Sequence, residues 1–306
     1  MNPAGEHSLP EGIIARAKAL GPVPMAVVNA GSPAALETAR AAQREGIVEP
    51  LLIGDADDIR RFAGELDWEL RDVRVLNAAS AEAAADCAAQ LARDGEVAAL
   101  LKGDIASASY LRAILKRENG LRTGRILSHV FHMSFPDGRR DIYITDGAMN
   151  VAPDVAMRVE IARNAIELLH AVGVSRPRVA VLSAIEYETE AMPSSLEAGR
   201  IVEACSSIAG ALFAGPMALD LAVSPAAAAL KNYRGPVAGN ADLLLVPTIE
   251  TGNALFKSLV HFSGAVAAGI VLGAKVPAAL GSRGDPLSSR VASAALAALR
   301  SGMRQG

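Results

Sequence analysis

Short apolar runs alternate with amphipathic segments along almost the whole chain, and this alternation constrains the fold more than any other feature. Strands that alternate with helices pair mainly in parallel and pack between helical layers, so the pattern predicts an α/β fold. The expected strands are Met25–Asn29, Pro50–Ile53, Val73–Leu76, Val97–Lys102, Ile126–Met133, Asp141–Thr145, Arg178–Ser183, Asp242–Val246, Gly269–Leu272 and Val276–Leu280. The expected helices lie near Pro33–Glu45, Ser80–Asp94, Ala106–Lys116, Asp154–Val172, Ser195–Ser206, Gly252–Phe262 and Pro286–Arg300.

One pair of expected strands interrupts this alternation. Ile126–Met133 and Asp141–Thr145 are joined only by Ser134–Arg140, which contains the turn signal Pro136-Asp137-Gly138. A connection this short cannot hold a crossover helix, so the pair should be antiparallel. An antiparallel insertion is a natural place for one lobe to end and another to begin, and we expect the lobe boundary near Arg125.

Composition agrees with a folded protein of two lobes. The chain has 306 residues, of which 51% are hydrophobic and 21% charged. A chain of this length tends to form more than one lobe, and this composition is typical of globular proteins rather than disordered ones. The formal net charge is −3 and no long basic block is present, so neither nucleic acid nor an anionic membrane is an expected partner.

The remaining bulk features point to a cytoplasmic protein without a disulfide framework. The N-terminal stretch is polar and lacks a secretory hydrophobic region. The apolar run Ala265–Leu280 contains two glycines, a lysine and a proline, which makes it too short and too broken for a membrane span. Cys87 and Cys205 do not form a metal-binding spacing.

Polar side chains gather around the expected hairpin, between Asn119 and Pro153. A hairpin that served only as core would not need them, whereas a site for an anionic substrate would. His129 and His132 lie three apart on a strand and therefore face opposite sides, which argues against a shared metal. The polar residues at or near the strand ends are Arg122, Arg125, Ser128, His129, Asp146 and Asn150.

A second candidate site follows the strand Val276–Leu280. Ser282, Arg283 and Asp285 occupy the loop between this strand and the next helix. In α/β folds the carboxyl ends of strands and the amino ends of helices form ligand crevices that favour anions. Two interpretations of Asp285 stay open, a ligand-facing carboxylate and a helix cap.

Two further segments place polar residues at strand ends. Lys102 closes an apolar strand, where a charge usually needs a partner or a ligand, and Arg112 lies on the next helix, facing either the same crevice or solvent. After the strand that ends at Val246, Glu250 either caps the following helix or faces a ligand, and Asn253 shares a face of that helix with Lys257. The motifs GxGxxG, GxxxxGK[ST] and GxSxG do not follow any expected strand, which disfavours dinucleotide binding, ATP hydrolysis and α/β-hydrolase chemistry.

These segments together resemble the phosphate acetyltransferase / phosphate butyryltransferase family. The likeness runs from about Gly95 to the C-terminus, and several ordered motifs make it specific. The matching stretches are K-G-D at Lys102–Asp104 with Arg112, N-G-L-R-T-G-R-I-L-S-H-V-F from Asn119, I-T-D-G-A-M-N-V-A-P from Ile144, the stretch Phe213–Asp220, P-V-A-G-N-A-D-L-L-L-V-P-x-x-E-x-G-N-x-x-x-K from Pro236, and S-R-G-D at Ser282–Asp285.

The resemblance implies a two-lobed α/β/α fold like that of isocitrate and isopropylmalate dehydrogenases, with mixed, mostly parallel sheets and a central cleft. The first lobe would comprise residues 1–125 and 276–306, and the second residues 126–275. It also implies a homodimer and the reversible transfer of a short-chain acyl group between coenzyme A and inorganic phosphate. Coenzyme A would be a substrate, and no tightly bound cofactor or metal is expected.

The resemblance also implies roles for the residues. Ser282, Arg283 and Asp285 would be catalytic, with Asp285 as the base for the coenzyme A thiol and Ser282 orienting that thiol or donating to the oxyanion. The substrate-binding set would be Lys102, Arg112, Arg122, Ser128, Asp146, Asn150, Glu250 and Asn253.

Two alternatives remain at this point. A decarboxylating NAD(P)-dependent dehydrogenase has a similar architecture but needs a carboxylate cluster for a divalent metal, and Asp146, Asp154 and Asp242 are scattered. A non-catalytic binder of acyl-CoA or of a phosphate ester is suggested by the sequence G-S-R-G-D-P, because butyryl-type members usually have T-S-R-A-D-S there.

Overall fold

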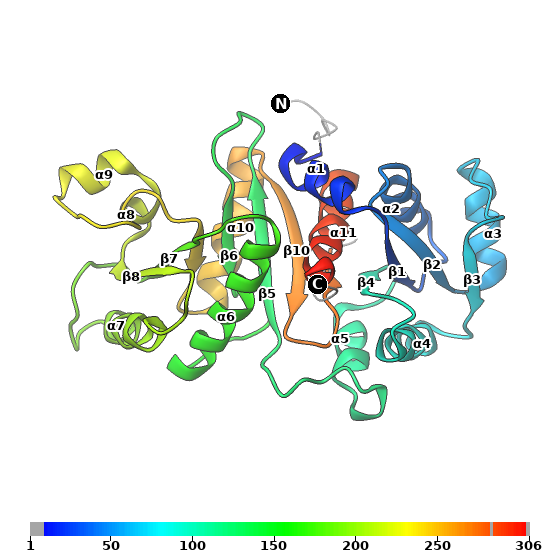
Figure 1. Cartoon of the computed structure of the whole chain (residues 1–306), viewed down its shortest axis with the longest axis horizontal. Helices are drawn as coiled ribbons and strands as arrows, with labels where there is room; N and C mark the ends of the chain where they lie inside the picture. Colours follow the sequence, from blue (N-terminus) through cyan, green and yellow to red (C-terminus); the bar gives the residue numbers. More distant parts are fainter. Residues whose placement is uncertain (1–8, 282–283, 304–306) are drawn as a thin grey trace. The chain divides into compact units, whose positions relative to one another are not determined.

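The structure is a computed structural model that describes residues 9–281 and 284–303 (Figure 1). The chain divides into two compact units. The first runs to Arg125 and resumes at Ala268, and the second is Ile126–Ala267. The resemblance implies a return crossing near Val276. In the structure most of β10 (Val266–Leu272) belongs to the first unit, since it pairs with a strand there and Gly269 N–H donates to Ser293 Oγ at 2.9 Å.

The first unit is built on a mostly parallel sheet. Its strands lie in the order β3-β2-β1-β4-β11-β10, and each neighbouring pair is parallel except β11 and β10. Parallel strands need crossover helices, which the intervening amphipathic segments provide. The strands are β1 (Val23–Val28), β2 (Val48–Gly54), β3 (Arg74–Asn77), β4 (Ala99–Lys102) and β11 (Ala278–Ala279).

Two groups of helices accompany this sheet. α11 packs on α1, α2 and β4, whereas α4 packs on α5 and also contacts β1 and β4. Ser32, Asp55 and Ser80 start α2, α3 and α4 as N-caps whose side chains accept backbone N–H groups. The helices are α1 (Glu11–Leu20), α2 (Pro33–Arg44), α3 (Ala56–Glu65), α4 (Ala81–Asp94), α5 (Ser107–Leu115), a short 3₁₀ turn (Arg117–Asn119) and α11 (Leu287–Gly302).

The strands of the second unit pair in the order β5-β6-β9-β7-β8. The pair β5–β6 is antiparallel, with Val130 opposite Thr145, which confirms the predicted hairpin, and the other pairs are parallel. The strands are β5 (Ser128–Ser134), β6 (Ile142–Thr145), β7 (Arg178–Leu182), β8 (Leu212–Met217) and β9 (Leu243–Leu245).

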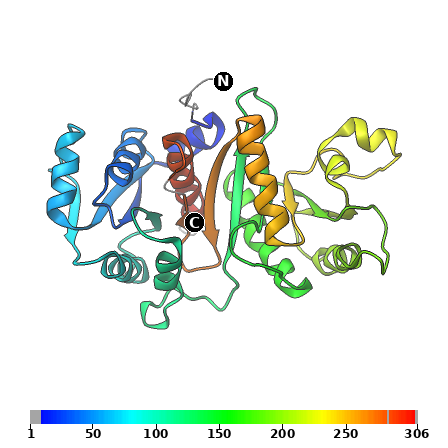
Figure 2. The ribbon, with the colours of Figure 1, turned by 180° about the vertical axis from the view of Figure 1, so that it is seen from behind.

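Helices cover both faces of the strands of the second unit. α6 and α10 each contact β5 and β6, and the two ribbon views show them on opposite faces (Figures 1 and 2). This is the α/β/α layering that the sequence predicts. The helices are α6 (Val155–Ala171), α7 (Pro193–Cys205), α8 (Leu219–Val223), α9 (Pro225–Leu230) and α10 (Ile249–Ser263).

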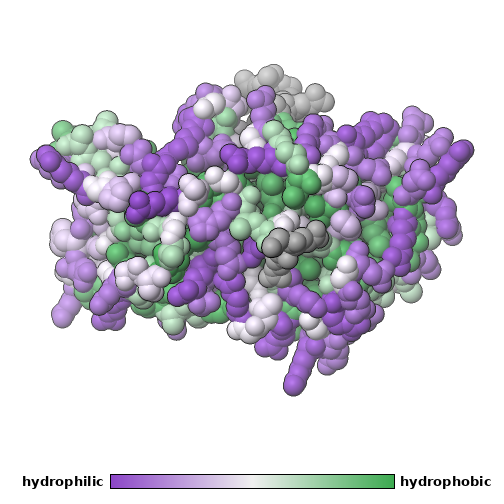
Figure 3. Space-filling view, in the orientation of Figure 1, coloured by the Kyte–Doolittle hydropathy of each residue, from purple (hydrophilic) through white to green (hydrophobic). Residues whose placement is uncertain are grey.

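The helix lengths and the exposed side chains describe the outside of the molecule. None of the helices within the described ranges is long and apolar enough to cross a membrane. Hydrophilic side chains cover most of the face seen in Figure 3, with smaller hydrophobic areas between them.

Candidate active site

The first unit contains a topological switch point between β1 and β4. From β1 the chain passes through α2 to β2 on one side, while β4 returns on the other side of β1. The loops that leave the carboxyl ends of β1 and β4 therefore diverge, and ligands of open α/β sheets bind in the crevice formed there. The position of this crevice follows from strand order alone.

The two diverging loops are bonded to each other at their bases. Gly103 N–H donates to Val28 O and Asp104 N–H to Asn29 O, each at 2.9 Å. The Asn29 side chain in turn donates to Asp104 O at 2.6 Å, from a backbone with φ of 55°. These hydrogen bonds continue the pairing of β1 with β4, so the two loops separate only beyond Asn29 and Asp104.

Gly103 is required by this close approach. A Cβ at Gly103 would lie 2.4 Å from Val28 O and 2.7 Å from Asn29 O. We expect Gly103→Ala to lower the free energy of unfolding by about 2–3 kcal/mol, because the backbone of one loop must shift away from the other. Gly64→Ala is the control, since a Cβ there, in the last turn of α3, meets nothing within 4 Å. Urea unfolding followed by circular dichroism measures both, and equal stability of the two variants would contradict this account.

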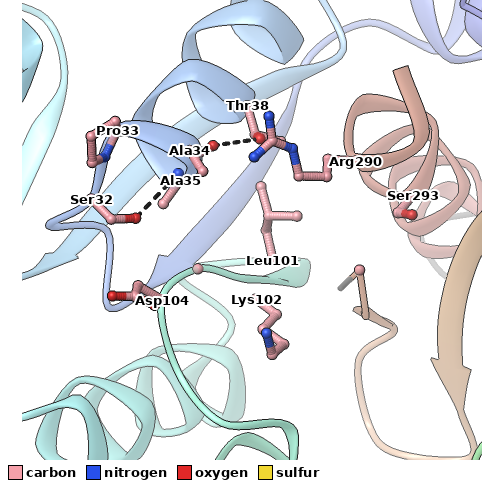
Figure 4. A pocket seen from close by; sticks show the side chains of 12 residues that line it. Ser32, Pro33, Ala34, Ala35, Thr38, Leu101, Lys102, Asp104, Arg290 and Ser293 are labelled. Carbon is pink, nitrogen blue, oxygen red and sulfur yellow. Dashed lines mark hydrogen bonds between the residues drawn. The ribbon is translucent and has the colours of Figure 1, made fainter. Parts of the chain in front are cut away.

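A pocket of about 320 Å³ lies in this crevice. It is bounded by the first turns of α2, by the end of β4, by Gly281 and by α11 (Figure 4). Arg290 reaches across from α11, and its Nη2 donates to Glu37 Oε2 on α2 at 2.7 Å. The lining residues are Ser32, Pro33, Ala34, Ala35, Thr38, Leu101, Lys102, Gly103, Asp104, Gly281, Arg290 and Ser293.

Asp285 lies beside this pocket. A Cβ built on Gly281 would be 3.6 Å from Asp285 Oδ2 and 3.6 Å from Arg290 Cγ. α11 begins at Leu287 with Pro286 as its N-cap, and no side chain caps it, so Asp285 precedes the capping position. Asp285 is therefore not the N-cap residue itself. Ser282 and Arg283 lie outside the described residues.

The other predicted residues of the first unit differ in their surroundings. Lys102 lines the pocket at the end of β4 and is partly buried. Arg112 and Arg122 have exposed side chains, and neither forms an ion pair within residues 9–281 and 284–303. The backbone of Arg122 forms an isolated antiparallel bridge with Ala274. Both arginines are thus available to an anion from outside.

In the second unit, Asp146 organises the loop after β6. Its Oδ1 accepts the backbone N–H groups of Ala148 and Met149 at 2.9 and 3.0 Å. Its Oδ2 accepts His129 N–H at 3.1 Å and the Asn150 amide at 2.7 Å. The carboxylate is 3% exposed and these bonds tie the loop to β5. Its acceptor positions are already used by the protein.

Ser128 and Asn150 belong to the same internal network. Ser128 Oγ is fully buried and accepts the Asn164 amide from α6 at 2.9 Å. Asn150 Nδ2 donates to Leu127 O at 2.9 Å as well as to Asp146. The structure thus gives each of these predicted substrate contacts an internal partner, and contact with substrate stays a prediction for them.

Two sequence motifs that are far apart in the chain meet in this unit. Gly147 and Gly252 pack backbone to backbone, because a Cβ on Gly147 would come within 2.8 Å of Gly252 C. Asn253 Nδ2 donates to Gly147 O at 3.3 Å. Hydrogen bonds from its own backbone and from the Thr248 side chain lower the pKa of Glu250, which lies in the first turn of α10.

Metal and thiol chemistry have little support in the part of the chain that is described. No group of at least three His, Cys, Asp or Glu side chains there could hold a metal ion. His132 is buried and its Nε2 lies 2.8 Å from Asp141 Oδ2. Burial raises the pKa of Cys205 to about 11 and also raises the pKa of Cys87, so neither thiol ionises readily at neutral pH.

Sequence reasoning identified one side of the pocket and missed the other. Lys102 and Asp285 were candidates, whereas Ala34, Thr38 and Arg290 were not, since they occur in ordinary helical patterns. The available signal was positional: Pro33 starts a helix directly after the first parallel strand, and that place in an α/β sheet is where ligands bind.

Known proteins are similar to this chain along nearly its whole length. The family model described as phosphate acetyl/butaryl transferase matches residues 81–298. The chain is 40% identical to the phosphate acetyltransferase of Rickettsia prowazekii (strain Madrid E) over 288 residues, which are 93% of this chain and 82% of that protein. It is 35% identical to the phosphate butyryltransferase of Clostridium acetobutylicum over 292 residues, 95% of this chain and 97% of that one.

A solved structure extends the comparison to the fold. The crystal structure of a branched-chain phosphotransacylase from Enterococcus faecalis V583 matches with a TM-score of 0.80 and 34% identity, covering 91% of this chain and 99% of that chain. Sequence motifs, family model and fold therefore agree, and the chain belongs to the phosphate acetyl/butyryl transferase family.

Proposed function

We propose that this chain is a phosphate acyltransferase, which transfers a short-chain acyl group reversibly between coenzyme A and inorganic phosphate. The observation that carries the proposal is the position of Asp285, whose carboxylate lies beside the rim of a pocket at a topological switch point, in a chain of this family. Coenzyme A is a substrate in this reaction, as are inorganic phosphate and the acyl phosphate.

The proposed chemistry is a direct displacement. Asp285 accepts the proton of the coenzyme A thiol, and the thiolate sulfur attacks the carbonyl carbon of the acyl phosphate. The carbon–oxygen bond to phosphate then breaks, and inorganic phosphate leaves with the bonding electrons. In the reverse direction the protonated Asp285 returns its proton to the departing thiolate. The step needs no enzyme thiol, which suits the raised pKa of Cys205.

Cationic and hydroxyl side chains complete the proposed site. We propose that Arg283 and Arg112 bind the negatively charged phosphoryl group, because a guanidinium group can donate two parallel hydrogen bonds to phosphate. Lys102, which lines the pocket, adds a further positive charge. Ser282 orients the thiol or donates to the oxyanion that develops on the carbonyl oxygen. We propose that the remaining residues of the substrate-binding set act with these groups, either by direct contact or by holding the loops that make it: Arg122, Ser128, Asp146, Asn150, Glu250 and Asn253.

We further propose that the enzyme acts as a cytoplasmic homodimer. The support is the family resemblance, which implies a dimer, together with substrates that belong to the cell interior. Light scattering coupled to size-exclusion chromatography reports the mass of the assembly directly.

The decisive experiment is phosphate-dependent release of free thiol from acetyl-, propionyl- and butyryl-CoA. We expect turnover that depends on phosphate concentration and on at least one of these acyl groups. Absence of turnover with all of them at millimolar phosphate would overturn the proposal. Thermal stabilisation by acyl-CoA without turnover would instead favour a non-catalytic binder.

A further inference from the structure

Arg290 links the start of α11 to α2. Its Nη2 donates to Glu37 Oε2 at 2.7 Å, although the two residues lie 253 positions apart in the chain. Arg290 is in the first turn of α11, and Glu37 is in the second turn of α2. The Arg290 side chain is 14% exposed and that of Glu37 is 47% exposed, so the arginine is the more buried partner. This ion pair therefore anchors the beginning of α11 on a regular helix.

The stem of Arg290 also lies beside the loop Gly281–Pro286, which holds the proposed catalytic residues. A Cβ built on Gly281 would be 3.6 Å from Arg290 Cγ and 3.6 Å from Asp285 Oδ2. Arg290 N–H donates to Pro286 O at 3.2 Å. Figure 4 shows Arg290 extending from α11 across the pocket towards α2. The Arg290 stem and the Asp285 carboxylate thus lie against the same point of the loop.

Stability alone does not account for the position of Arg290. Its Nε is buried and has no hydrogen-bond acceptor within residues 9–281 and 284–303. A buried N–H group without an acceptor destabilises the folded state, and a buried ion pair can often be replaced by apolar side chains without loss of stability. A charged side chain that is held in this way beside a pocket indicates a functional role.

Arg290 anchors the loop on its downstream side. Upstream, Leu280 N–H donates to Gly269 O at 3.0 Å. Downstream, α11 begins at Leu287 without a side-chain cap, whereas α2, α3 and α4 each begin with one. A capping side chain restrains the chain at the first turn of a helix, so α11 lacks that restraint. The bond from Arg290 to Glu37 supplies a restraint in its place.

We propose that Arg290 is a positioning residue for the proposed reaction: Glu37 holds its guanidinium group, and its stem fixes the place of the Asp285 carboxylate. The inference rests on the proposed function and adds a residue to it. Asp285 must lie within hydrogen-bond reach of the thiol proton, and a displacement of about 1 Å at a reacting group can lower the rate about 100-fold. Loss of the anchor should therefore lower kcat and leave substrate binding nearly unchanged.

The first test is Arg290→Met, which keeps an unbranched stem but has no guanidinium group. We expect kcat to fall at least tenfold, while KM for acyl-CoA and for phosphate changes less than threefold. The thermal midpoint should not fall, because the buried unpaired N–H is removed and Glu37 is exposed enough to be hydrated. A residue that served only to stabilise the fold would give the reverse pattern, a lower midpoint with an unchanged kcat.

Three further variants separate anchoring from other effects. Arg290→Lys keeps a cation that can reach Glu37 and should recover part of the lost kcat. Glu37→Ala removes the acceptor at a half-exposed helix position, where alanine is well accommodated, and should lower kcat as Arg290→Met does. Arg74→Met is the matched control, because Arg74 forms an ion pair of 2.6 Å with Glu96 in the same unit but does not line the pocket. It should leave kcat unchanged.

A double-mutant cycle tests whether Arg290 acts through Asp285. If it does, adding Arg290→Met to Asp285→Asn should lower kcat by less than a further threefold, because the carboxylate that Arg290 positions is already gone. Adding Glu37→Ala to Arg290→Met should likewise have no further effect. Losses that multiply in full would mean that Arg290 affects the reaction independently of Asp285, and would overturn the inference.

The outcomes separate this inference from the proposed function. If the wild type turns over no acyl-CoA, the proposed function fails and the positioning role fails with it. If the wild type is active and Arg290→Met retains its kcat, or loses activity only through a higher KM, the positioning role alone is overturned. Should Arg290→Met fail to fold, Glu37→Ala carries the same test with Arg290 in place, and an unchanged kcat in that variant overturns the inference.

Discussion

Replacing Asp285 with asparagine is expected to lower kcat by about three orders of magnitude. The amide has nearly the size of the carboxylate but cannot accept the thiol proton, so the attacking sulfur stays protonated for most of the time. Asp285 stands before the N-cap of α11, beside Gly281. The thermal midpoint of the variant, measured beside kcat, separates a loss of chemistry from a loss of folding.

The pH dependence of kcat in this variant tests whether Asp285 acts as the general base for the thiol. A free thiol ionises with a pKa of about 8.5, so raising the pH supplies thiolate without help from the enzyme. The ratio of wild-type kcat to the kcat of Asp285→Asn, measured in the direction of acyl-CoA formation, should fall steadily as the pH rises from neutral to about 8.5. Asp137→Asn, which alters an exposed carboxylate in the β5–β6 turn, is the control and should keep full activity. A deficit that stays constant with pH would remove Asp285 as the base.

The largest expected loss of stability belongs to Asp146→Ala, at about 3–5 kcal/mol. The carboxylate accepts hydrogen bonds from the backbone of His129, Ala148 and Met149 and from the Asn150 amide. Removing it leaves the buried His129 N–H and three part-buried donors without their acceptor, in a place where Asp146 itself is only 3% exposed.

Chemical unfolding in urea tests this prediction. Asp146→Asn should lower the stability less than Asp146→Ala, because the amide retains one oxygen acceptor. It should still be less stable than the wild type, because its NH₂ group faces N–H donors. Asp137→Ala, in an exposed turn, serves as the control and should leave the unfolding midpoint unchanged. A loss below about 1 kcal/mol for Asp146→Ala would mean that the loop after β6 holds its shape by other contacts.

Much of the fold could be predicted from hydrophobic pattern, and the elements that were missed share a physical reason. β8 contains Gly215 and Pro216, which interrupt a strand pattern, and its pairing with β7 comes from tertiary context. α3 is strongly charged and buries only Ile59 and Ala63, so its sequence looks like a loop. α1, α8 and α9 were also missed; α8 and α9 are each under two turns long, and a helical period is hard to detect there.

The candidate site was less predictable than the fold. Sequence pattern finds a charge where charge is unexpected, as at Lys102, but it cannot tell whether a polar group is already bonded inside the protein. Asp146 was predicted to contact substrate, yet its oxygens accept four N–H groups of the chain. Conversely, Ala34 and Thr38 bear no chemical signal of their own and gain a role only from the space beside them.

The composition of the first unit from two distant stretches of chain has a consequence for biosynthesis. α11, which is buried among α1, α2 and β4, is synthesised after the whole of the second unit. The second unit is a continuous stretch, Ile126–Ala267, and can form while translation continues. The first unit cannot be completed until the stretch from Ala268 that includes α11 has also been made. A nascent chain halted before Leu287 would therefore expose the unfinished face of β4, and that arrested state is where chaperone binding and aggregation should concentrate.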